Sequence, residues 1–123
     1  MEEIYLLENQ LKTQPQFLLL KLWRGRKHSQ GQFHNGHWGW FESYELADSK
    51  TGFRCMQYLK DFENRNIPIH KERFKDQYGK LKYYYSLGCL PHFIIWSDII
   101  ENWKVWKYDY QEAYDKAFKK QGV

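Results

Sequence analysis

The sequence predicts a single small α+β domain, in which an N-terminal antiparallel β-hairpin or meander packs against three to four helices. The length of 123 residues suits one domain with one core. An Asn-Gly pair between strand-like segments is the strongest short-range signal for a β-hairpin. Apolar residues in the second half mainly have helical spacing. No internal repeat or linker divides residues 1–123.

The N-terminal quarter is predicted to form a helix followed by a strand. Apolar residues at helical spacing predict a short helix over residues 2–12, ending before Pro15. The apolar run at residues 16–24 (QFLLLKLWR) has the length of a buried strand and is predicted to be one. We expect the polar, glycine-punctuated GRKHSQGQ at residues 25–32 to be a flexible loop.

The segment HNGHWGWFESYE is predicted to contain the hairpin. A type I′ turn needs positive φ at both central residues, which suits the Asn-Gly pair. His34 and His37 would then face each other across the ladder, with Cβ atoms about 5 Å apart on the same face. Strand alternation would place Trp38, Trp40 and Tyr44 together on one face.

The next segments are predicted to be mainly helical. Residues 52–64 have apolar residues at i, i+3, i+4 and i+7, which predicts a helix. Residues 69–88 allow either a helix, from the spacing of their rings, or a hairpin that turns near Gly79; we favour the helix. HFIIW at residues 92–96 is predicted to be a short buried strand, followed by a turn of helix through Trp103.

The C-terminal segment is predicted to be an amphipathic helix. Asp109 and Glu112 have the spacing of a capping box, with Asp in place of Ser or Thr. Apolar residues behind them recur at helical spacing, and Gly122 is well placed to end the helix.

The two cysteines, Cys55 and Cys89, are far apart and have no neighbouring CxxC, so we expect two small buried apolar residues. This usage suits a reducing compartment. The N-terminus is acidic where a secretory signal would be basic, and the longest apolar run is too short to span a bilayer. We therefore expect a cytoplasmic protein without a membrane segment.

Aromatic side chains are unusually abundant, because eight Phe, ten Tyr and six Trp make up 20% of the chain. Each ring buries about 150–250 Å² when fully packed. A core of this size must also hold its Leu and Ile, so we expect several rings at the surface. Exposed aromatic clusters commonly mark binding faces.

Basic residues accompany these rings. The net charge is +4, and residues 21–40 contain four basic residues and no acid. Lysine and arginine contact phosphates, and exposed rings stack on unpaired bases for about 1–3 kcal/mol each. The sequence therefore predicts a binding surface made of Arg24, Arg26, Lys27, His28, His34, His37, Trp38, Trp40, Lys80, Lys82 and Tyr84.

We expect a small non-catalytic protein that uses this surface to bind nucleic acid, single-stranded or duplex, or a nucleoprotein complex. The alternative is an inhibitor or adaptor that occludes a larger protein, such as a nucleic-acid-handling enzyme, in an immunity-like or anti-defence-like role. This alternative uses the same residues, because Trp, Tyr and Arg are enriched at protein–protein hot spots.

A third hypothesis is a small metal- or histidine-dependent nuclease built on His34 and His37. A zinc site needs at least three protein ligands, and no third ligand lies within a few residues of this pair. The sequence also lacks GxGxxG, GxxxxGK[ST], GxSxG and HExxH motifs. We therefore expect no metal, cofactor or catalytic residue.

Overall fold

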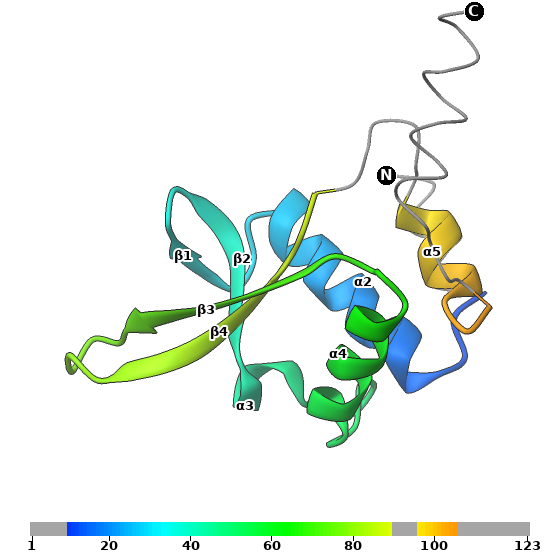
Figure 1. The fold of residues 1–123 in the computed structure, drawn as a ribbon, viewed down its shortest axis with the longest axis horizontal. Coiled ribbons are helices and arrows are strands. Elements are labelled where there is room, and N and C mark those ends of the chain that lie inside the picture. Colours follow the sequence, from blue (N-terminus) through cyan, green and yellow to red (C-terminus); the bar gives the residue numbers. More distant parts are fainter. Residues whose placement is uncertain (1–9, 90–95, 106–123) are drawn as a thin grey trace, which may run out of the picture.

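The computed structural model describes residues 10–89 and 96–105, which form a small α+β domain with a four-stranded antiparallel sheet and four helices (Figure 1). The strand order is β1-β2-β4-β3. In chain order the elements are α2 (Gln14–Lys27), β1 (Gln32–His34), β2 (His37–Glu42), α3 (Ser43–Leu46), α4 (Cys55–Asn64), β3 (Ile69–Lys75), β4 (Leu81–Leu87) and α5 (Trp96–Asn102).

Three predicted elements fall wholly or largely outside the described residues: the helices over 2–12 and 109–122 and the strand at 92–96. The predicted helix over 52–64 is confirmed as α4, with a start three residues later. The helical turn expected before Trp103 is confirmed as α5.

Helix α2 occupies the run at residues 16–24 that was predicted to be a buried strand, and that prediction is wrong. The backbone N–H of Thr13 donates to Gln16 Oε1 at 3.2 Å, which caps the first turn. Pro15 lies in that turn, where a backbone N–H has no partner within the helix, so the missing N–H of proline costs no hydrogen bond. Leucine also favours a helix because it is not branched at Cβ. The buried leucines of α2 are Leu18, Leu19, Leu20 and Leu22.

An uninterrupted apolar run does not distinguish a buried strand from a helix that is buried on several sides. The length of the element distinguishes the two, because α2 spans 14 residues and is longer than a typical strand. It continues through Gly25 and Lys27, which were predicted to begin a flexible loop. Gln16 Nε2 also donates to the carbonyl oxygen of Ile100 at 3.2 Å, which ties α2 to α5.

The predicted turn of the β1–β2 hairpin is confirmed. Asn35 and Gly36 have φ values of 52° and 87°, and the two histidines that flank them pair across the ladder. The ladder shifts register further along, where Gly39 has φ 98°. A Cβ at Gly39 would lie 2.9 Å from the backbone nitrogen of Arg26, so only glycine allows this close approach of β2 to α2.

The irregularity at Gly39 separates the two tryptophans that were predicted to share an exposed face. Trp38 is 42% exposed, whereas Trp40 is only 1% exposed. Tyr44 does not continue the strand but belongs to α3. The prediction that Trp40 is a surface residue is therefore wrong.

Residues 69–88 form the β3–β4 hairpin, so the helix that was favoured for them is wrong and the alternative is correct. Asp76 Oδ1 accepts the backbone N–H groups of Tyr78 and Lys80 at 2.8 and 2.9 Å. Gly79, at the tip of this turn, has φ 79°. These local hydrogen bonds stabilise a turn that reverses the chain, so a helix cannot continue through this position.

The main core lies where the helices pack against one face of the sheet. Phe41 of β2 and Tyr85 of β4 contribute from this face, and Phe62 and Trp103 meet edge to face at 5.4 Å between α4 and the end of α5. Gly25 of α2 lies directly against Phe41, where a Cβ would be 2.6 Å from the ring.

A second, smaller aromatic cluster lies on the opposite face of the sheet, where the β1–β2 hairpin pairs with the β3–β4 hairpin. The His34 ring stacks on Phe74 at 4.8 Å and lies 4.6 Å from Tyr84, and Trp40 meets Phe74 edge to face at 5.0 Å. Trp40 Nε1 donates to the carbonyl oxygen of His34 at 2.9 Å. This cluster buries Tyr84 as well as Trp40, so the predicted exposure of Tyr84 is also wrong.

Candidate nucleic-acid interface

The β3–β4 hairpin sorts its charged residues by face. Lys71, Arg73 and Lys75 alternate along β3, so they project from the same face. Their partners in the ladder are Tyr85, Tyr83 and Leu81. Within this hairpin, the face contains no acidic side chain, because Glu72 lies on the opposite face.

Tyr83 lies among these cations and is 49% exposed. Lys71 Nζ is 4.6 Å and Arg73 Cζ is 5.3 Å from the centre of its ring. Such cation–π contacts contribute about 0.5–1 kcal/mol at exposed sites. Lys71, Arg73 and Lys75 form no ion pair with any residue that the structure describes. We call Lys71, Arg73, Lys75 and Tyr83 the cation–tyrosine surface.

Lys82, one of the predicted binding residues, has a different environment on the opposite face. Its Nζ lies 3.3 Å from Asp76 Oδ2 and 3.3 Å from Glu42 Oε1. The hydrogen bonds to Asp76 and Glu42 raise the pKa of Lys82. Its charge is therefore largely balanced by acids within the protein. Lys80, by contrast, is exposed in the turn.

The predicted basic residues of α2 divide between structural contacts and the surface. Arg26 donates to the carbonyl oxygen of Leu87 at 2.9 Å, which joins α2 to β4. Arg24 is half-buried and also has a partner. Lys27 and His28 are exposed at the end of the helix, and the His28 ring lies edge to face with Trp23 at 5.5 Å.

Trp38 is the tryptophan of the β1–β2 hairpin that remains available at the surface. Its ring meets Phe33 edge to face at 5.4 Å, and both rings are exposed. The predicted excess of rings over core space is therefore confirmed in part. Of the predicted surface rings Trp38 is exposed, whereas Trp40 and Tyr84 are buried in the second aromatic cluster.

His34 and His37 face each other across the turn, as predicted, but each ring is engaged in packing. His34 Nε2 lies 2.9 Å from Gln32 Oε1, and His37 Nδ1 lies 2.8 Å from the carbonyl oxygen of Trp38. The His37 ring also stacks on Trp40 at 5.0 Å. Among the described residues, no group of three or more His, Cys, Asp or Glu side chains is arranged to hold a metal ion.

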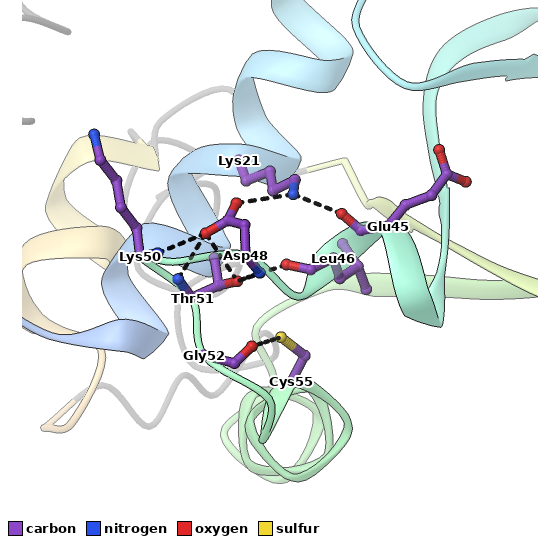
Figure 2. Close-up of polar contacts among 8 residues, drawn as sticks. All are labelled: Lys21, Glu45, Leu46, Asp48, Lys50, Thr51, Gly52 and Cys55. Carbon is purple, nitrogen blue, oxygen red and sulfur yellow. Dashed lines mark hydrogen bonds and ion pairs between the residues drawn. The ribbon is translucent and has the colours of Figure 1, made fainter.

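A separate polar cluster fastens the loop between α3 and α4 to α2 (Figure 2). Asp48 Oδ1 accepts the backbone N–H groups of Lys50 and Thr51 at 2.8 and 2.9 Å, and Asp48 Oδ2 lies 2.9 Å from Lys21 Nζ. Desolvation raises the pKa of Asp48, but these bonds outweigh it and lower the pKa to about 2. Thr51 Oγ1 donates to the carbonyl oxygen of Leu46 at 2.6 Å.

Cys55 lies beside this cluster, and its Sγ donates to the carbonyl oxygen of Gly52 at 3.5 Å (Figure 2). Burial raises the pKa of the Cys55 thiol, so the group stays protonated and is a poor nucleophile. The cluster thus acts as a structural clamp. Cys89, which was predicted to be buried, is exposed, with Sγ 3.5 Å from Arg26 Nη2.

The cation–tyrosine surface was missed because residues 69–88 were interpreted as a helix. Lys80, Lys82 and Tyr84 were selected because cations and rings are adjacent in the sequence there, and the helical interpretation hid the period of two in IHKERFK. Alternation along a strand would have placed three basic residues of that segment on one face.

In residues 10–89 and 96–105, none of the helices has the length and apolar character needed to cross a bilayer. Comparison with models of protein families, with curated proteins and with solved structures finds no match to this chain. A functional proposal therefore depends on the geometry and charge of the chain itself.

Proposed function

We propose that this protein binds nucleic acid through the cation–tyrosine surface. The main support is that three cations and a half-exposed tyrosine lie together on one strand face that carries no acidic side chain. None of the three cations forms an ion pair with a residue that the structure describes. Lysine and arginine neutralise phosphates and release counterions, which supplies most of the non-specific affinity. An exposed ring adds stacking on bases. Such binding requires no catalytic group.

The strand geometry favours a ligand that follows β3. Residues two apart on a strand are separated by about 6.8 Å, so the three cations form a line about 14 Å long. A nucleic-acid strand presents its phosphates in a line, whereas a compact anion would contact only one or two of these groups. The line of cations therefore supports a polyanion as the ligand.

The test is a salt titration of oligonucleotide binding, followed by fluorescence anisotropy. We expect the triple variant Lys71→Ala, Arg73→Ala, Lys75→Ala to bind more weakly. The slope of log K against log salt should fall in magnitude by about 2, since each contact with a single strand contributes about 0.7. Circular dichroism would verify that the variant is folded.

The matched control removes the same charge from residues outside the β3–β4 hairpin. Lys12→Ala, Lys27→Ala, Lys104→Ala changes three exposed lysines, of which Lys27 belongs to the predicted surface. We expect a smaller loss of affinity from this variant. If the control loses as much as the first triple variant, binding is not localised to β3. If the wild-type protein shows no salt-dependent binding of single-stranded or duplex oligonucleotides, the proposal is wrong.

The inhibitor or adaptor function has separate support from rings distant in sequence from β3. Tyr44 and Phe53 are 70% and 88% exposed, and large exposed rings commonly become buried when a protein partner binds. A pull-down with and without nuclease distinguishes the two functions. A nuclease-resistant stoichiometric partner that is lost with Phe53→Ala and kept with the β3 triple variant would favour a protein target.

A further inference from the structure

A pocket lies between α4 and the start of the β3–β4 hairpin, next to the cation–tyrosine surface. Its volume is about 330 Å³, at the lower end of the range for small-molecule sites. Its apolar lining consists of Met56, Leu59, Ile69 and Tyr85, and its charged lining consists of Lys60, Glu63 and Lys71.

Lys71 connects the pocket with the cation–tyrosine surface, because it contributes to both. It pairs with Tyr85 in the ladder, and Tyr83 follows two residues away on the same face of β4. A nucleic-acid strand whose phosphates lie along Lys71, Arg73 and Lys75 would therefore pass the opening of the pocket.

The lining suits a flat group with a polar edge. The apolar side chains and the Tyr85 ring would cover the faces of such a group. Lys60 would donate hydrogen bonds to acceptors on its edge, and Glu63 would accept from a donor. A nucleobase combines apolar faces with an edge that carries these polar groups.

We infer that this pocket receives an unpaired base, so that the ligand of the cation–tyrosine surface is single-stranded. In a duplex both faces of each base are stacked and only its edges reach the grooves, so no face can enter a pocket. The inference rests on the proposed function and adds to it the strand state of the nucleic acid and the place where a base binds.

The test compares three labelled probes by anisotropy: an oligothymidylate of about 15 nucleotides, the same backbone with abasic sites, and a duplex of equal length. The abasic strand keeps the phosphates and removes the bases. One stacked base contributes about 5- to 150-fold, and the abasic strand loses the base in the pocket as well as any base on Tyr83, so we expect the intact strand to bind at least about 5-fold more tightly. The duplex should bind more weakly than the intact strand.

Met56→Trp tests the pocket directly, because Met56 is exposed at its rim and a larger side chain there fills the cavity without altering the core. We expect this variant to lower the affinity for the intact strand and to leave binding of the abasic strand unchanged. Gln57→Trp is the matched control, since Gln57 is exposed on α4 and does not line the pocket. Near-ultraviolet circular dichroism checks that both variants are folded.

Each outcome separates the inference from the proposed function. Equal binding of intact and abasic strands would overturn the inference, yet the salt-dependent contribution of Lys71, Arg73 and Lys75 would still stand. A preference for the intact strand that Met56→Trp does not change would place the base elsewhere and also overturn it. If none of the three probes binds, the proposed function fails, and the inference fails with it.

Discussion

Arg73 and Tyr83 face each other across the β3–β4 ladder, and the Arg73 guanidinium carbon lies 5.3 Å from the centre of the Tyr83 ring. Lys71 approaches the same ring to 4.6 Å from a diagonal position. The ring thus positions two cations, and the three groups together present positive charge and an aromatic face on one side of the hairpin.

Replacing Tyr83 should weaken the binding of single strands more than it weakens the fold. We expect Tyr83→Ala to lower affinity about 5- to 150-fold through lost stacking, and to reduce the free energy of unfolding by about 1–2 kcal/mol through two lost cation–π contacts. Tyr83→Phe should keep most of the affinity. Tyr78→Ala removes an exposed ring at the turn of the same hairpin and should have little effect. Equal losses for Tyr83→Ala and Tyr78→Ala in anisotropy titrations would contradict this role.

The two tryptophans of β2 should differ in their contribution to stability. Trp40 is packed in the second aromatic cluster, so Trp40→Ala should reduce the free energy of unfolding by about 3–5 kcal/mol. Trp38→Ala removes an exposed ring with one edge-to-face contact, and should cost about 1 kcal/mol. Urea denaturation of both variants measures the difference. Similar costs at the two positions would show that the cluster contributes little.

Asp48 should make stability depend on pH in acid. Its pKa is about 2 in the folded protein against an ordinary value of 3.8, so the folded state holds its proton less tightly than the unfolded state. The ionised carboxylate therefore stabilises the fold above about pH 4, and this contribution is lost as the pH falls towards 2. Because the side chain is 41% exposed, solvent screening reduces the contribution to about 1 kcal/mol.

The comparison for Asp48 is Asp48→Asn, which cannot ionise. We expect the variant to be less stable than the wild type near neutral pH, with the difference narrowing in acid. Urea midpoints measured across the acid range test this expectation. A constant difference between the two proteins down to about pH 2 would mean that the bonds to Lys21, Lys50 and Thr51 do not depend on the charge.

Gly25 should resist replacement even though it lies within a helix. Alanine there would gain about 1 kcal/mol in helix propensity, but its Cβ would lie 2.6 Å from the Phe41 ring. Overpacking of this kind costs about 1–3 kcal/mol, so we expect Gly25→Ala to destabilise the protein. Phe41→Leu should relieve the contact, giving the double variant a smaller loss than the sum of the single variants. Additive losses would indicate that the two residues are not in contact.

Local signals were sufficient for several elements. The Asn-Gly pair predicted the first hairpin correctly, because the positive φ values of Asn35 and Gly36 are a property of those residues. Helix α4 was predicted because its apolar residues keep a period near 3.6 over ten residues. In α2 the capping residues Thr13 and Gln16 were present in the sequence, but the apolar run behind them was interpreted as a strand.

The candidate site was less predictable, because a surface is formed by residues that are far apart in the chain. Trp and Tyr are residue types that are common in binding sites, but Trp40 and Tyr84 are buried because the two hairpins pack together. Lys82 is a free cation in the sequence and a partner of Glu42 and Asp76 in the fold. Sequence proximity of rings and cations therefore did not indicate which of them reach the surface.

The sequence by itself determined the α+β class, the turn at Asn35 and Gly36 and the amphipathic α4, since these depend on backbone preferences and spacing within a few residues. Only the tertiary structure decided which face of each strand is covered. The cations of β3 lie together beside Tyr83 because strand pairing brings distant residues within contact distance, and α4 completes the neighbouring pocket. Burial depends on what packs against a residue, and that is set by the whole fold.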